Sequence, residues 1–326
     1  MKTSAAEHQP IRALAVVGAT ASGKSALALA LAAHLGGEIL SVDSMQVYRG
    51  MDIGTAKPSA AERAAVAHHL IDICDPRTSF SVAEYIPLAL AAAREVTARG
   101  RLPILCGGTG LYLDALLRGE APAALASDPV LHAQLENDLE TYGASALHAR
   151  LRAVDPESAD AIHENNTRRV LRALEIYLCS GKPKSVWDRE SRRRPPTLDL
   201  CCIRLCYHRR DTLNDRIDRR VDEMMAAGLL NEVRRLAADG VFSQNSTAAA
   251  AIGYKELLPV LDGRQTVADA VENLKLATRH YAKRQETWFA ARPYARPLYC
   301  DDENGRLLQK EDLVATALAV WQSAAH

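Results

Sequence analysis

A phosphate-binding loop near the start of the chain constrains the fold more than any other part of this sequence. Residues 14–17 form an apolar run of strand length, and an Ala- and Leu-rich run of helix length ends at Leu35. Between the two stands the pattern Gly18-Ala19-Thr20-Ala21-Ser22-Gly23-Lys24-Ser25. A glycine loop between a strand and a helix is typical of P-loop proteins, which include nucleotide-binding and ATP-binding enzymes. The alternative is a chance glycine loop in front of a helix.

Each residue type in this loop suits phosphate binding. Gly18 and Gly23 allow the backbone to curl so that several N–H groups point inward, and the N-terminus of the following helix adds a partial positive charge. Lys24 supplies a mobile full charge for the outer phosphate, and the Ser25 hydroxyl suits Mg2+. We therefore expect residues 18–25 to bind a di- or triphosphate, with Ser25 as the metal ligand.

The charge balance excludes a general electrostatic attraction for nucleic acid. Lys and Arg together number 40, as do Asp and Glu, so the formal net charge is +0 and any nucleic acid must be held by local patches. Seven cysteines without a C-x-x-C pair predict reduced thiols, mostly in the core. No signal-peptide pattern and no apolar run of membrane-spanning length is present, which predicts a cytoplasmic protein.

Short apolar runs predict an α/β fold with a parallel sheet. Residues 38–42, 70–73, 102–106 and 198–207 read as further strands, with helices between them. Asp43 follows the second strand directly. Because ligands of open parallel sheets lie beyond the carboxyl ends of the strands, Asp43 and the phosphate loop are expected to face one cleft. A helix cap or turn residue is the alternative for Asp43.

The residues after these strands carry further information. Residues 43–58 predict a long ordered loop, a kind of segment that often carries function. The fourth strand ends in Gly107-Gly108-Thr109 and lacks the terminal Asp that an ATPase uses for Mg2+, which argues against nucleotide hydrolysis. Tight packing alone is the alternative for these glycines. His68 and His69 are adjacent on a strand and point to opposite faces, which argues against metal binding.

The middle of the chain predicts a helical insertion. Asp128-Pro129 and Asp155-Pro156 are helix-start signals, and helical patterns continue to about Gly181. The basic stretch 182–196 is interpreted as a mobile connection back to the core, or simply as a solvated linker. The expected division is a catalytic core of residues 1–120 and 197–326, with an insertion of residues 121–196.

Two later helices carry basic residues at regular spacing. Arg216 and Arg220 are four residues apart and share a helix face, so they could clamp a diphosphate or form surface ion pairs. Residues 267–289 predict a long helix in which basic side chains alternate with Tyr281 and Trp288. This pattern suits phosphate contacts beside base stacking, and the alternative is that the two aromatic side chains anchor the helix in the core.

Taken together, these motifs resemble the tRNA dimethylallyltransferase (tRNA isopentenyltransferase) family over nearly the whole chain. The matching stretches are residues 18–25, 43–58, 68–72, 107–112, 169–175, 216–220, 251–256 and 281–289. The resemblance implies a P-loop kinase-like core with a helical insertion. It also implies transfer of a dimethylallyl group from dimethylallyl diphosphate to the N6 amino group of the adenosine 3′ of the tRNA anticodon, at position 37.

The resemblance further implies roles for individual residues. Asp43 is the general base, Lys24 and Arg220 hold the diphosphate together with residues 18–25, and Mg2+ is the cofactor. The residues implied to contact the anticodon stem-loop of tRNA are Asp43, Ser44, Met45, Gln46, Thr109, His132, Arg168, Arg169, Arg172, Gly253, Lys255, Lys283 and Arg284. His132 and Ala250 depart from the residues usual in the family, so their contacts are in question. The enzyme is expected to act as a monomer.

Two other functions remain open from the residues alone. A nucleotide or small-molecule kinase shares the phosphate loop, but it does not explain residues 43–58 or the basic aromatic helix. A noncatalytic tRNA-binding module leaves Lys24 and Asp43 without a purpose.

Overall fold

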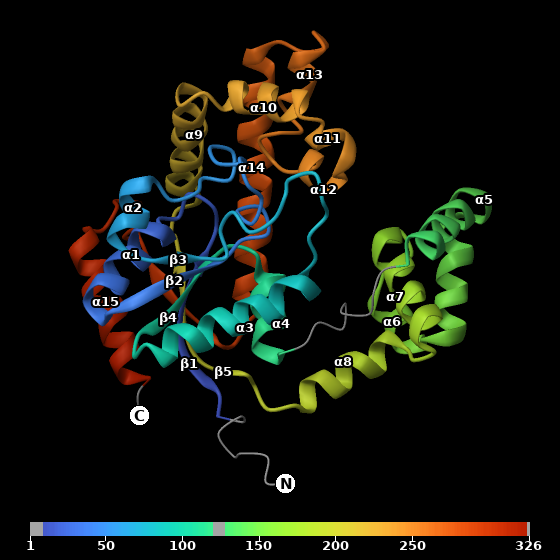
Figure 1. The fold of residues 1–326 in the computed structure, drawn as a ribbon, viewed down its shortest axis with the longest axis horizontal. Coiled ribbons are helices and arrows are strands. Elements are labelled where there is room, and N and C mark those ends of the chain that lie inside the picture. Colours follow the sequence, from blue (N-terminus) through green and yellow to red (C-terminus); the bar gives the residue numbers. More distant parts are fainter. Residues whose placement is uncertain (1–8, 120–127, 325–326) are drawn as a thin grey trace. The chain divides into compact units, whose positions relative to one another are not determined.

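A computed structural model gives the structure of residues 9–119 and 128–324, which divide into two compact units (Figure 1). The first unit comprises Met1–Ser81, Pro87–Asp114 and Leu198–His326. The second unit comprises Val82–Ile86 and Ala115–Thr197. The sequence predicts that residues 1–120 and 197–326 form a catalytic core and that residues 121–196 are an insertion. This assignment stays a prediction.

The first unit is built on a parallel sheet of six strands in the order β3-β2-β4-β1-β5-β6. The strands are β1 (Ile11–Gly18), β2 (Gly37–Val42), β3 (His68–His69), β4 (Leu102–Gly107), β5 (Leu198–Cys206) and β6 (Ala295–Tyr299). Residues 13–18 of β1 are fully buried, as expected for a central strand covered on both faces. The predicted α/β fold with a parallel sheet is therefore confirmed.

Helices cover the sheet and extend beyond it (Figure 1). Those of the first unit, or shared by both units, are α1 (Lys24–Leu35), α2 (Ala60–Ala65), α3 (Val82–Ala98), α4 (Gly110–Arg118), α9 (Arg210–Ala226), α10 (Leu229–Ala238), α11 (Val241–Gln244), α12 (Ser246–Ala249), α13 (Leu258–Leu261), α14 (Val267–Ala290) and α15 (Lys310–Ser323). Leu27 and Leu31 of α1 pack with Val314 of α15 against Leu14 and Val16 of β1. This packing forms the main core.

The carboxyl ends of β1, β2 and β4 meet at one edge of the sheet. Val17 of β1 and Val42 of β2 both pair in register with Gly107 of β4. A Cβ added at Gly107 would lie 2.0 Å from the Val42 carbonyl oxygen, so only glycine permits this approach. The phosphate loop, Asp43 and the Gly107-Gly108-Thr109 turn therefore leave the sheet side by side.

One sequence prediction about a strand is wrong, and one strand was missed. The third strand is His68–His69 and not residues 70–73, because Leu70 and Asp72 have positive φ angles of 66° and 61° that no strand accommodates. The edge strand β6 was not predicted. Its sequence, Ala-Arg-Pro-Leu-Tyr, contains an exposed proline beside an exposed arginine, and proline within a sheet is confined to edge strands, strand starts and bulges.

The second unit consists of helices, chiefly α5 (Pro129–Val154), α6 (Pro156–Ala161), α7 (Thr167–Ser180) and α8 (Lys184–Arg193). The two Asp-Pro start signals are confirmed, because the Asp128 carboxylate accepts from Val130 N–H and the Asp155 carboxylate accepts from Ser158 N–H. Leu147 and Leu151 of α5 pack in one core with residues of α7.

The interpretation of residues 182–196 as a mobile basic connection is wrong for most of the stretch. Residues 184–193 form helix α8, and Asp155 also accepts from the N–H of Ser185 near its start. Lys184 pairs with Asp188 at 2.5 Å, and Lys182 and Arg189 also make ion pairs with acidic partners. The basic residues therefore have acidic neighbours that the charge run alone did not reveal.

Residues 43–58 are anchored by a single buried carboxylate. Glu232 of α10 accepts hydrogen bonds from the backbone N–H groups of Asp52, Ile53 and Gly54 at 2.9–3.1 Å, and from the Tyr254 hydroxyl at 2.7 Å. Burial and the neighbouring Glu232 raise the pKa of Tyr254, so this hydroxyl stays a donor. The predicted long ordered loop is confirmed, and Glu232 of α10 fixes its residues 52–54.

We expect Glu232→Gln to lower the free energy of unfolding by about 2–3 kcal/mol, because an amide NH2 would face backbone donors in place of a charged acceptor. Urea denaturation measures this loss. Glu303→Gln, at an exposed turn, is the control and should change the value by less than about 0.5 kcal/mol. Equal stability of the two variants would show that Glu232 does not anchor the loop.

Candidate functional site

The phosphate loop connects β1 to α1 in the strained form that its glycines predict. Gly18 and Gly23 have φ angles of 149° and 95°, and Ala21 also has a positive φ of 60°. A left-handed conformation costs a residue with a side chain about 1–2 kcal/mol, so Ala21 must be held by its surroundings.

Three side chains from distant elements hold this loop. Arg216 of α9 donates from Nε to the carbonyl oxygen of the strained Ala21 at 2.9 Å. The Tyr207 hydroxyl donates to the Ser22 carbonyl at 3.0 Å, and the Gln285 amide oxygen accepts from the Thr20 N–H at 2.8 Å. The alternative of Arg216 as a surface ion-pair residue is therefore wrong, because its guanidinium holds the loop.

A cavity of about 270 Å³ lies at the loop, and we call it the phosphate pocket. The residues of the sequence prediction that line it are Thr20, Ala21, Gly23, Lys24, Ser25, Asp43, Gln46 and Arg220. Gly18, Ala19 and Ser22 shape the loop without lining this pocket. The expectation that Asp43 and the loop face one cleft is thus met by the geometry.

The phosphate pocket holds more positive than negative charge close to Lys24. Lys24 Nζ donates to the Ala19 carbonyl at 3.2 Å. Burial lowers the pKa of Lys24, and the nearby Arg220 guanidinium lowers it further. Burial also lowers the pKa of Arg220, which Asp43 partly offsets, and Arg220 Nε has no partner among the described residues. An anion entering the pocket would relieve this strain on both cations.

Asp43 has one oxygen occupied and one available. Its Oδ1 accepts from the N–H groups of Met45 at 2.9 Å and Gln46 at 3.4 Å, so the turn-residue alternative describes half of its role. Within the described part of the chain, Oδ2 accepts no hydrogen bond. Gln46 is itself fixed, since its amide donates to the Thr55 and Ala56 carbonyls. The carboxylate is therefore oriented and still has a lone-pair oxygen for chemistry.

The turn after β4 combines tight packing with a functional position. The Thr109 hydroxyl accepts from the Ser44 N–H at 3.0 Å, next to Asp43. An added Cβ at Gly107 would lie 2.0 Å from the Val42 carbonyl oxygen, and one at Gly108 would lie 2.1 Å from Gln285 Nε2, so tight packing accounts for both glycines. Trp288 packs against the turn as a core anchor, whereas Tyr281 lines the phosphate pocket.

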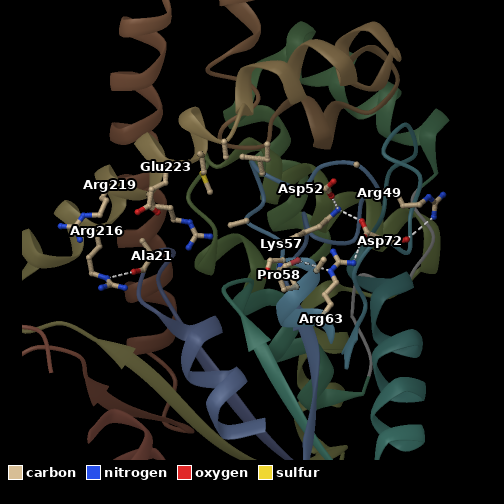
Figure 2. A pocket seen from close by; sticks show the side chains of 18 residues that line it. Ala21, Arg49, Asp52, Lys57, Pro58, Arg63, Asp72, Arg216, Arg219 and Glu223 are labelled. Carbon is tan, nitrogen blue, oxygen red and sulfur yellow. Dashed lines mark hydrogen bonds and ion pairs between the residues drawn. The ribbon is translucent and has the colours of Figure 1, made fainter. Parts of the chain in front are cut away.

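A larger cavity of about 1060 Å³ adjoins the phosphate pocket, and we call it the basic groove (Figure 2). The two cavities share the lining residues Ala21, Ala56, Pro58, Arg216 and Arg220. Figure 2 shows Arg216, Arg219 and Glu223 along α9 on one side and Lys57, Arg63 and Asp72 on the other.

Charges on the two sides of the basic groove differ in their pairing. On the loop side, Lys57 pairs with Asp52 at 2.7 Å and Asp72 at 2.5 Å, and Arg63 pairs with Asp72 at 2.8 Å. On the α9 side, Arg219 is exposed and makes no ion pair with another described residue. Arg49 on the loop side also lacks an ion pair within the described ranges, because its guanidinium donates to the Asp72 backbone carbonyl. Unpaired cationic charge therefore lies on both sides of the groove.

The remaining predicted tRNA contacts do not line the phosphate pocket. Lys283 and Arg284 are exposed on α14, with Arg284 5.7 Å above the Tyr281 ring. Gly253 and Lys255 lie between α12 and α13, and the Gly253 N–H donates to Glu256. Those in the second unit are His132 of α5 and Arg168, Arg169 and Arg172 of α7. These assignments stay predictions.

Some functional positions were missed from the sequence. Gln285, Tyr207 and Cys106 all contact or line the loop region. Only Gln285 carried a signal in the sequence, because it is a polar residue on the buried face of α14. Burial raises the pKa of Cys106 to about 11, so its thiol stays protonated and is not a nucleophile at neutral pH. Over residues 9–119 and 128–324, no cluster of His, Cys, Asp and Glu could hold a metal without a substrate, and no helix is long and apolar enough to span a membrane.

Comparisons with known proteins agree with this geometry. Residues 46–292 match the family described as IPP transferase, and residues 11–73 match isopentenyl transferase. The chain is 47% identical over 312 residues to a tRNA dimethylallyltransferase of Roseiflexus sp. (strain RS-1), covering 95% of this chain and 99% of the relative. It is 49% identical to that of Bacillus subtilis (strain 168), covering 86% and 88% of the two chains.

Solved structures show the same relationship. The tRNA isopentenylpyrophosphate transferase of Bacillus halodurans has a TM-score of 0.68 at 41% identity, covering 97% of this chain and 98% of that one. A eukaryotic dimethylallyltransferase described as acting on tRNA has a TM-score of 0.79 at 29% identity, covering 95% and 77%.

We expect Lys24→Met to weaken binding of inorganic diphosphate about 10- to 100-fold, because a charged hydrogen bond to phosphate is worth about 1.5–3 kcal/mol. Isothermal titration calorimetry measures the affinity. Lys310→Met, at the exposed start of α15, is the matched control and should bind like the parent. Undiminished affinity in Lys24→Met would place the anion elsewhere.

The basic groove generates a salt-dependent prediction. Arg219→Glu reverses the exposed charge on α9, and we expect it to weaken diphosphate binding about 3- to 10-fold at low salt, with the difference vanishing at high salt. Arg264→Glu reverses a charge that lines neither cavity and should have no effect. A salt-independent loss in Arg219→Glu would mean a structural defect in place of electrostatic attraction.

Proposed function

The chain belongs to the IPP transferase family, and we propose that it transfers a dimethylallyl group from dimethylallyl diphosphate to the N6 amino group of the adenosine 3′ of the anticodon in tRNA. Diphosphate is the second product. Its curated relatives carry the name tRNA dimethylallyltransferase, and they cover most of its length. The enzyme is thus a prenyl-transferring one.

One observation carries the proposal: the phosphate pocket holds Lys24, Arg220 and Asp43 together. The two cations suit the leaving diphosphate, and the carboxylate suits a proton acceptor. A kinase would also need the loop and could use a carboxylate, but the relatives argue against this alternative.

The reaction makes a specific demand for a base. An adenine amino group is a weak nucleophile because its lone pair is delocalised into the ring. As the N6–C1 bond forms, the C1–O bond of the donor breaks and the diphosphate leaves with the electron pair. Asp43 takes the N6 proton, which removes the positive charge that develops on nitrogen.

Charge that develops on the leaving group falls on donors already in place. Lys24, Arg220 and N–H groups of the loop provide them, and Arg216 and Gln285 hold the loop so that it need not rearrange during the reaction. This pre-organisation is the physical reason for three side chains to hold one short loop.

Mg2+ fits the oxygen groups of the pocket. The Ser25 hydroxyl and the Asp43 carboxylate both line it, and Mg2+ commonly uses one or two protein oxygens with substrate phosphates completing its ligands. When bound, the ion supplies charge neutralisation to the diphosphate. Ser25 is the residue that we propose to hold it.

Recognition of tRNA follows from the same geometry. Ser44, Gln46 and Thr109 border Asp43 and are proposed to contact the target adenosine, which must leave its stack to reach the carboxylate. The exposed Lys283 and Arg284 are proposed to meet the tRNA backbone, together with the basic residues of the second unit. We further propose that the enzyme acts as a cytoplasmic monomer.

We expect Asp43→Asn to slow single-turnover transfer about 100- to 10,000-fold, the range typical of general-base assistance. Asn keeps the size and the turn-forming oxygen but cannot take a proton. The rate is measured at saturating donor and tRNA, with the melting temperature recorded alongside. Diphosphate affinity should stay within about threefold, since Lys24 and Arg220 remain.

Asp239→Asn, at an exposed position after α10, is the control and should transfer at the parent rate. A nearly full rate in Asp43→Asn would mean that the base lies elsewhere, and a loss matched by unfolding would make Asp43 structural.

A further inference from the structure

We infer that Gln285 is a positioning residue that sets the distance between the diphosphate donor and the acceptor base, an inference that rests on the proposed function. Gln285 lies on α14 and is 5% exposed. Its Oε1 accepts from the Thr20 N–H of the phosphate loop at 2.8 Å, and its Nε2 donates to the Gly108 carbonyl at 2.9 Å. One amide therefore bridges the loop after β1 and the turn after β4.

The turn is shaped around this amide. A Cβ added at Gly108 would lie 2.1 Å from Gln285 Nε2, so the absence of a side chain there makes room for the bridge. The next residue, Thr109, accepts from the Ser44 N–H, and Ser44 follows Asp43 directly. A continuous path of short contacts thus runs from the donor loop through Gln285 to the segment that carries the base.

The reaction gives this bridge a purpose. The loop holds the leaving diphosphate. The adenine amino group attacks C1 of the donor from the opposite side, and Asp43 must accept its proton. A displacement of about 1 Å between the two groups can cost on the order of 100-fold in rate.

Only a group that both donates and accepts can make this bridge. The Thr20 N–H requires an acceptor, and the Gly108 carbonyl requires a donor. An ionised carboxylate only accepts, whereas a protonated carboxyl does both. Glutamate at position 285 should therefore restore the bridge in its protonated form and repel the Gly108 carbonyl in its ionised form.

Several charged or titratable groups face the same pocket as Gln285. They are Lys24 of α1, Asp43 after β2, Glu62 of α2, His68 of β3, Cys106 of β4, Arg216 and Arg220 of α9, and Tyr281 of α14. The parent shares all of them with each variant. Dividing the rate of a variant by the parent rate at each pH therefore removes their own titration from the comparison.

The experiment compares Gln285→Met and Gln285→Glu with the parent enzyme in single-turnover transfer at saturating donor and tRNA, from pH 6 to pH 8.5. We expect Gln285→Met to lose about 10- to 100-fold at every pH. Gln285→Glu should lose as much at pH 8.5 and regain at least about fivefold, relative to the parent, by pH 6 as the buried carboxyl takes up a proton. Affinity for inorganic diphosphate should stay within about threefold in Gln285→Met, because the other loop donors remain.

Gln244→Met and Gln244→Glu, at an exposed position in α11, are the matched controls and should follow the parent at every pH. A full rate in Gln285→Met, or a rate ratio of Gln285→Glu that does not change with pH, would overturn the inference. So would a loss of rate that follows diphosphate affinity and melting temperature, because that would be a purely structural effect. If the parent enzyme itself leaves tRNA unmodified, that result contradicts the proposed function and does not contradict the Gln285 bridge.

Discussion

The close approach of Gly107 to Val42 is the constraint on which the rest of the site depends. Three parallel strands, β1, β2 and β4, end beside one another because glycine at this point lets two backbones come within contact distance. The phosphate loop, the segment that begins with Asp43 and the Thr109 turn consequently begin within a few residues of the same point. A side chain at position 107 would separate these three segments.

The pocket at this edge is prepared for a polyanion in two ways. Its cations are partly desolvated, so burial lowers the pKa values of Lys24 and Arg220 and makes an anion favourable there. Its loop is held from outside by Arg216, Tyr207 and Gln285, which stabilise the left-handed Ala21. Charge and rigidity come from different elements, which explains why α9 and α14, far along the chain, matter to a loop near its start.

Local sequence patterns succeeded where local physics decides the structure. The two Asp-Pro helix starts and the apolar strands of the sheet centre depend on neighbours within a few residues, so they were predictable. The short strand at His68 and the edge strand β6 were not, because the positive φ angles after His69 and the pairing of a proline-containing segment with β5 depend on contacts outside the segment. Helix α8 was mistaken for a linker because the basic residues in the sequence do not show which acidic residues Lys182 and Arg189 pair with.

The sequence by itself determined the phosphate loop, the carboxylate after the second strand and the resemblance to a family, because these are patterns of residue type and spacing. Only the tertiary structure decided that Arg216 holds the loop, that Glu232 orders residues 43–58, and that Gln285 joins the loop to the turn. Each of these side chains bonds to a backbone more than 170 residues away. Backbone N–H and carbonyl groups are alike at nearly every residue, so no sequence pattern marks which of them a distant side chain will meet.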